Sequence, residues 1–74
     1  MQTSARNQLK GTVRSVELGA IMAEVVVAIC DQEVVAAITR ASTERLDLKE
    51  GDEVTVIIKA TEVMIATADR PGPD

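Results

Sequence analysis

IMAEVVVAI (residues 21–29) is apolar at every position except Glu24, and its centre, Val25–Val27, is β-branched. Branched side chains favour extended backbone, so this stretch predicts a strand that is apolar on both faces. A small barrel has only one interior, and we therefore expect a second copy of the chain to cover the other face. The alternative is that small residues such as Ala23 and Ala28 are tolerated at the surface.

The segment before this strand predicts a bulged strand at residues 9–18. Leu9, Gly11 and Val13 alternate with polar residues, and the apolar phase then slips by one position. A β-bulge near Arg14–Ser15 is the simplest way to keep the later apolar residues on the same face.

Three further strands and one helix are expected downstream. The strands cover residues 34–39, 53–59 and 63–67. Residues 42–48 predict a short helix with Ser42 as its N-cap. Five strands, with the helix between the third and the fourth, predict an all-β fold, a small five-stranded OB-like barrel. An SH3-like barrel is the alternative that the pattern leaves open.

The composition limits the size and the core of the protein. The chain has 74 residues, 46% of them hydrophobic, and contains no Phe, Tyr or Trp. A chain of this size without aromatic residues has little apolar surface to bury, so we expect oligomerisation to supply the missing stability. Residues 1–68 are expected to form a single domain, and residues 69–74, which contain two prolines and no apolar side chain, a flexible C-terminal tail.

The net charge of the chain limits which classes of partner it can bind. Twelve acidic and eight basic residues give a net charge of −4, which argues against a nucleic-acid binder, as does the absence of aromatic residues on which bases could stack. Charged residues interrupt every stretch long enough to span a bilayer. The N-terminal residues lack the apolar core of a signal peptide, so we expect a cytoplasmic protein without a membrane partner.

No catalytic set is evident. The chain has no His, so a serine or cysteine nucleophile lacks its commonest base, and a metal cluster of His and Cys is excluded by count. We expect the single cysteine, Cys30, to be a small buried residue. The glycines are isolated and form no phosphate-binding loop. We therefore expect a binding protein and not an enzyme.

Two segments are rich in hydrogen-bond donors. Residues 4–7 (SARN) offer hydroxyl, guanidinium and amide groups, and residues 59–62 (KATE) add an ammonium and a hydroxyl. Together they would suit a small oxyanion. On the residues alone, the competing interpretation is that Arg6 and Lys59 are ordinary surface charges.

The same segments carry a resemblance to a known family. SARNQLKG (4–11) and IKATEVMI (58–65) resemble the two signature segments of the molbindins, the single-domain molybdate-binding proteins of the TOBE (Mop) superfamily. The resemblance continues through residues 19–20, 24–26 and 46–51. It implies an OB-like barrel that pairs into dimers, three of which form a homo-hexamer. It further implies binding of molybdate or tungstate for storage, buffering or delivery, without an organic cofactor or a directly coordinated metal.

The resemblance also implies which residues hold the anion at the subunit interfaces. The first kind of site takes one segment from each of two subunits: Ser4, Ala5, Arg6 and Asn7 from one, and Lys59, Ala60 and Thr61 from the other. The second kind lies near the threefold axis and uses backbone around Gly19, Ala20 and Ile21. Many relatives have a polar pair after that turn, where this chain has Met22 and Ala23. The rival hypothesis is a regulatory or assembly module of the same fold without physiological anion binding.

Overall fold

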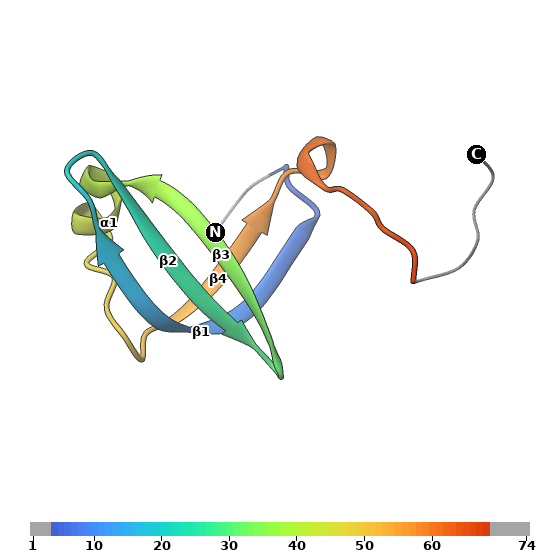
Figure 1. The fold of residues 1–74 in the computed structure, drawn as a ribbon, viewed down its shortest axis with the longest axis horizontal. Helices are drawn as coiled ribbons and strands as arrows, with labels where there is room; N and C mark the ends of the chain where they lie inside the picture. The colour runs from blue at the N-terminus through green and yellow to red at the C-terminus, as the bar shows by residue number, and fades with distance from the viewer. Residues whose placement is uncertain (1–3, 69–74) are drawn as a thin grey trace.

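The computed structural model describes residues 4–68, which form one antiparallel sheet curled into an open barrel (Figure 1). The order in the sheet is β3-β2-β1-β4. The elements are, along the chain, β1 (Asn7–Leu18), β2 (Met22–Ile29), β3 (Gln32–Thr39), α1 (Arg40–Arg45), β4 (Glu53–Ile58) and a one-turn 3₁₀ helix, η1 (Ala60–Glu62). The predicted all-β class with one short helix is confirmed. The tail expected at 69–74 lies outside the described residues.

The long strand β1 is shared by both halves of the sheet. Its first half pairs with β4 and its second half with β2. The register with β2 shifts between Val13 and Ser15, so the bulge predicted near Arg14–Ser15 is confirmed. A bulge bends and twists its strand, and this lets the sheet curl. At Gly11 an added Cβ would lie 2.5 Å from the carbonyl oxygen of Ala28. Only glycine at this position therefore allows β2 to approach β1 this closely.

The core lies on the inner face of the curled sheet. Val13, Val25 and Val27 are each no more than 3% exposed. Their aliphatic neighbours are half-buried: Val16, Ile29, Ala36, Ile38, Leu48, Val54 and Val56. On the opposite face, Met22 and Val35 are exposed, as expected for strands that are apolar on both faces.

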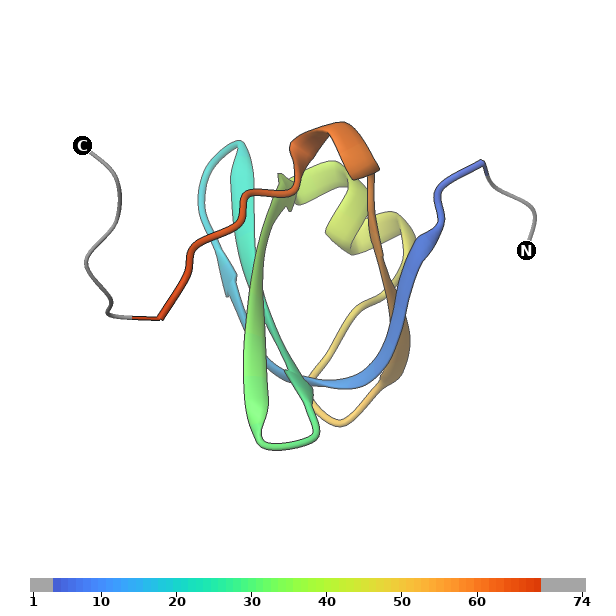
Figure 2. The ribbon, with the colours of Figure 1, turned by 90° about the vertical axis from the view of Figure 1, so that its right-hand side faces the viewer.

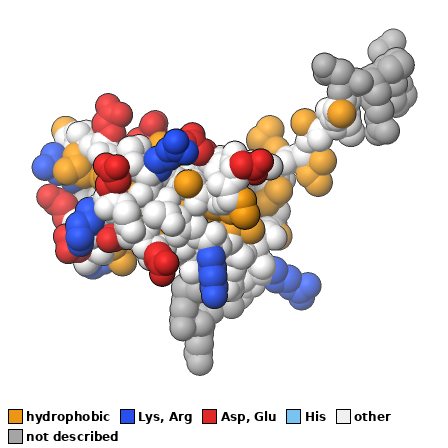
Figure 3. Space-filling view, turned by 90° about the horizontal axis from the view of Figure 1, so that it is seen from below, with side chains coloured by type: hydrophobic (Ala, Val, Ile, Leu, Met, Phe, Trp, Pro, Cys, Tyr) orange, Lys and Arg blue, Asp and Glu red, His pale blue; other side chains and the backbone are white. Residues whose placement is uncertain are grey.

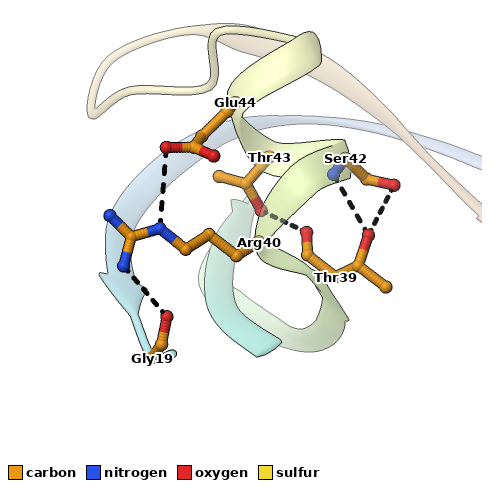
Figure 4. Close-up of polar contacts among 6 residues, drawn as sticks. All are labelled: Gly19, Thr39, Arg40, Ser42, Thr43 and Glu44. Atoms are coloured by element: carbon orange, nitrogen blue, oxygen red, sulfur yellow. Dashed lines mark hydrogen bonds and ion pairs between the residues drawn. The ribbon is translucent and has the colours of Figure 1, made fainter. Parts of the chain in front are cut away.

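The helix begins earlier than the sequence indicated. Thr39, the last residue of β3, is the N-cap, because its extended backbone lets its hydroxyl accept a hydrogen bond from the amide of Ser42 at 3.1 Å (Figure 4). The prediction of Ser42 as N-cap was therefore wrong. Ser42 lies inside the first turn, and its hydroxyl accepts a second bond from Thr39 at 2.8 Å. No helix within residues 4–68 has the length and apolar character needed to cross a bilayer.

Two local predictions need correction. Residues 63–67 form no strand in this chain, so residues 4–68 contain four strands and not five. The reason is η1, whose hydrogen bonds turn the backbone so that the following residues leave the barrel (Figure 1). Cys30 is exposed, not buried. It lies in the turn between β2 and β3 and has a φ of 56°, which places it at the tip of the hairpin.

Candidate functional site

A hollow of about 480 Å³ lies at the end of the barrel where β1 begins and β4 ends. Asn7 pairs with Ile58, so the residues before β1 lie beside those after β4 (Figure 2). The hollow is lined by Ser4, Ala5, Arg6, Ile57, Lys59, Ala60 and Thr61. It thus contains six of the seven residues predicted for the first kind of site. The exception is Asn7, which lies in the β1–β4 ladder.

Both donor-rich segments come from the same chain in this arrangement. The resemblance assigns residues 4–7 to one subunit and residues 59–61 to another. Here the antiparallel pairing of β1 with β4 is sufficient to bring them to one hollow. A second subunit is therefore not needed to assemble the lining, although it remains available to cover the hollow.

The charge of the hollow is positive. Arg6 and Lys59 are both exposed, and neither forms an ion pair within the described part of the chain. In contrast, Arg14, Arg40 and Lys49 are each paired with a carboxylate. No Asp or Glu among residues 4–68 lines the hollow. Two cations without a carboxylate partner at one site are an arrangement that favours an anion.

Several carbonyl groups around the hollow are already engaged. The side-chain amide of Gln8 donates to the carbonyl oxygen of Ala5 at 2.9 Å. The carbonyl oxygen of Lys59 accepts a bond from the amide of Glu62 at 2.9 Å, and that of Ala60 accepts one from Val63 at 3.3 Å. The groups left to meet a ligand are mainly donors: the two cations and the hydroxyls of Ser4 and Thr61. The bond from Gln8 links the start of β1 to the segment before it, and no pattern in the sequence predicted this contact.

The turn predicted for the second kind of site is anchored by the helix. The amide of Gly19 donates to the carbonyl oxygen of Met22 at 2.8 Å, so this donor is used within the turn. The guanidinium of Arg40 donates to the carbonyl oxygen of Gly19 at 3.2 Å and pairs with Glu44 at 3.5 Å (Figure 4). The Arg40 amide also donates to the carbonyl oxygen of Ile21 at 2.7 Å. Ala20 and Ile21 are left exposed at the tip.

A metal site of the usual protein ligands is not formed by residues 4–68, where no three His, Cys, Asp or Glu side chains gather. The chemistry available at the hollow is hydrogen bonding and charge, supplied by side chains of Ser, Thr, Lys and Arg. This arrangement can bind a small anion but offers no evident nucleophile with a base beside it.

Known proteins resemble this chain over most of its length. Residues 3–65 match the TOBE domain family. Molybdenum-pterin-binding protein 3 of Clostridium pasteurianum is 50% identical over 66 residues, which are 88% of this chain and 97% of that protein. Molybdenum-pterin-binding protein 1 of the same organism is 48% identical over the same shares.

Solved structures show the same fold. A molybdate binding protein from Sporomusa ovata has a TM-score of 0.86 and 43% identity, over 90% of this chain and all of that one. The cytoplasmic molybdate-binding protein ModG, in a form with molybdate bound, has a TM-score of 0.76 and 39% identity, over 81% of this chain and 43% of that one. The OB-like architecture expected from the sequence is thus shared with molybdate-binding proteins.

Proposed function

Because this chain belongs to the TOBE domain family, we propose that it binds molybdate or tungstate in the hollow between residues 4–7 and 59–61. The observation that carries the proposal is the lining itself, which holds two cations without carboxylate partners and no acidic side chain. The names of the relatives supply the identity of the anion. They are binding proteins, and we propose the same for this chain, with no catalytic role.

The chemistry of the anion fits the lining. Molybdate is a tetrahedral dianion that carries no proton at neutral pH, so it needs donors and no acceptor. Much of phosphate still bears a proton at this pH and needs an acceptor to satisfy it. Around this hollow the carbonyls of Ala5, Lys59 and Ala60 are occupied by other donors. The two cations and the hydroxyls of Ser4 and Thr61 can all donate to molybdate, whereas among these side chains only the two hydroxyls could accept the proton of phosphate, so the lining favours molybdate over phosphate. The overall charge of −4 does not oppose binding strongly, because distant charges are screened beyond about 8 Å at physiological salt.

Assembly completes the proposed site. Of the seven residues that line the hollow, six are exposed in the single chain, the apolar Ile57 among them, and Ala5 is half-buried. A dianion held only on an open surface stays largely hydrated, and selectivity is then weak. We propose that a second subunit covers the hollow in a homo-hexamer built as a trimer of dimers. The protein would store, buffer or deliver the oxyanion in the cytoplasm, the compartment given for ModG.

The turn at residues 19–21 is proposed as a second, weaker contact for the anion. Its support is the rigid anchoring by Arg40, which fixes the backbone of the turn. Because the Gly19 amide is used inside the turn, the donors available there are those of Ala20 and Ile21.

The role of Lys59 can be tested by replacing it with alanine. A charge-assisted hydrogen bond contributes about 1.5–3 kcal/mol, so Lys59→Ala is expected to weaken molybdate binding by about 10- to 150-fold. Equilibrium dialysis with molybdate measures this change. The melting temperature without ligand should hardly move, because Lys59 is exposed and unpaired within residues 4–68.

Lys10 provides a matched control for this experiment. It is also an exposed lysine without an ion pair in the described part of the chain, but it does not line the hollow. Lys10→Ala removes the same charge and is expected to leave the affinity within about twofold, since distant exposed charges are screened. Equal losses in the two variants would mean that Lys59 acts only through the net charge, and the assignment of the site would be wrong.

A further inference from the structure

Gln8 is bonded to the lining of the hollow without being part of that lining. It is the second residue of β1, and its side-chain amide donates to the carbonyl oxygen of Ala5 at 2.9 Å. Ala5 lines the hollow together with Ser4 and Arg6, whereas Gln8 does not line it. Any effect of Gln8 on a ligand in the hollow must therefore pass through the segment to which Ala5 belongs.

Gln8 also lies beside the opposite wall of the hollow. In the antiparallel ladder of β1 with β4 it is the partner of Ile57, and Ile57 lines the hollow. Directly opposed residues of such a ladder carry their side chains on the same face of the sheet. Gln8 is thus next to a lining residue of β4 and bonded to a lining residue of the N-terminal segment, at the place where the two segments meet.

The segment that carries the N-terminal donors lies outside this ladder. Pairing of β1 with β4 begins at Asn7, so it does not hold residues 4–6. Figure 3 shows Lys and Arg side chains that project from the surface of the protein. A long side chain of this kind has a defined place in a site only where its backbone is supported. The bond from Gln8 supplies such support at Ala5, between the hydroxyl of Ser4 and the guanidinium of Arg6.

The same bond changes what the carbonyl group of Ala5 presents to a ligand. A carbonyl oxygen only accepts hydrogen bonds and is the negative end of a dipole, so it opposes a nearby dianion unless a donor engages it. The amide of Gln8 is such a donor. Phosphate that bears a proton would gain from this oxygen, because its O–H group needs an acceptor. Engagement of the carbonyl by Gln8 therefore favours an anion without protons.

We propose that Gln8 is a positioning residue that also sets the selectivity of the oxyanion site. Through Ala5 it orients the donors of Ser4 and Arg6, and by engaging the Ala5 carbonyl it raises the preference of the site for molybdate over phosphate. This inference rests on the proposed function, because it concerns the same hollow. It adds a residue that acts on the anion only through the backbone of the segment before β1.

Replacement of Gln8 by methionine tests both effects. Methionine is similar in length but has no N–H donor, and Gln8 is exposed, so Gln8→Met should fold like the unmodified protein. Its affinity for molybdate is expected to fall by about 2- to 12-fold, the factor that corresponds to one ordinary hydrogen bond. Phosphate loses the same positioning but gains an acceptor, so the ratio of molybdate affinity to phosphate affinity should fall by a similar factor. Equilibrium dialysis with molybdate, repeated with phosphate as a competitor, measures both affinities.

Gln32→Met is the matched control. Gln32 is an exposed glutamine at the start of β3 that does not line the hollow, so the same substitution there should change neither affinity. A merely structural role of Gln8 would weaken the binding of both anions equally. An unchanged ratio in Gln8→Met would therefore overturn this inference and leave the proposed function intact. Absence of molybdate binding by the unmodified protein would overturn both.

The pH dependence of the ratio tests the effect on the Ala5 carbonyl by itself. As the pH falls through neutrality, phosphate carries more protons while molybdate still carries none, so more of the phosphate needs an acceptor. The difference in ratio between Gln8→Met and the unmodified protein is therefore expected to grow on the acid side of neutrality. A difference that stays the same across this range would contradict the proposed effect of Gln8 on selectivity.

Discussion

Replacing Gly11 with alanine is expected to lower the free energy of unfolding by about 3 kcal/mol, at the upper end of the usual cost of overpacking. The new Cβ would lie 2.5 Å from the carbonyl oxygen of Ala28, 2.7 Å from Cγ1 of Val27 and 2.9 Å from Cγ1 of Ile29. The nearest of these atoms is backbone, so it can move only if β1 and β2 separate. Stability of small domains is about 0.05–0.15 kcal/mol per residue, and the loss would therefore be a large part of the total.

Urea denaturation followed by circular dichroism measures this loss. Lys10→Ala on the same strand is the control, because Lys10 is exposed and surface changes usually stay within about 0.5 kcal/mol. If Gly11→Ala and Lys10→Ala had the same urea midpoint, the close approach of β2 to β1 would not be a feature of the folded protein.

Molybdate is expected to raise the stability of the folded protein by about 2.7 kcal/mol per independent site at a hundredfold excess over the dissociation constant. The reason is mass action, since the hollow joins residues 4–6 to residues 59–61 only when β1 is paired with β4. The unfolded chain holds no such arrangement of donors. The effect should appear as a higher melting temperature at fixed protein concentration.

The same melting experiment with tungstate, sulfate and phosphate provides the control. Tungstate, which is nearly equal to molybdate in size and charge, should act like molybdate. Sulfate is smaller and should do much less at equal concentration, and phosphate should do less because much of it carries a proton. Equal shifts from all four anions would reduce the effect to general stabilisation by salt and would remove the support for a specific site.

The four observed strands were predictable because each carries a local signal, either alternation of apolar and polar residues or a run of apolar residues. The phase slip after Val13 located the bulge, and the continuous apolar run of residues 21–29 located β2. The start of α1 was not predictable from local preference, since both Thr39 and Ser42 are good N-cap residues. The choice depends on how far β3 continues, and pairing of Thr39 with Met22 carries β3 up to the helix.

The lack of a strand at residues 63–67 was missed for a different reason. Residues 63–67 have the apolar character of a strand, and this much is visible in the sequence. Whether such a segment pairs depends on how the backbone leaves β4, and η1 directs it away from the barrel.

The two segments of the candidate site were singled out by their donor groups, and the resemblance then implied which of their residues hold the anion. Arg6 and Lys59 alone look like surface charges. They become candidates for one site because the pairing of Asn7 with Ile58 brings their two segments to the same hollow. Two contacts were missed: the local bond of Gln8 to Ala5, and the anchoring of the Gly19 turn by Arg40, which depends on tertiary structure.

Calorimetric titration of the unmodified protein with molybdate, beside sulfate and phosphate at the same concentrations, tests the central claim most directly. We predict saturable binding of molybdate, since the hollow offers two cations and hydroxyl donors and no carboxylate from residues 4–68. We predict no saturable binding of sulfate, which is smaller, or of phosphate, much of which carries a proton, in the same range. Absence of saturable molybdate binding would contradict the claim and would favour a regulatory or assembly module of the same fold.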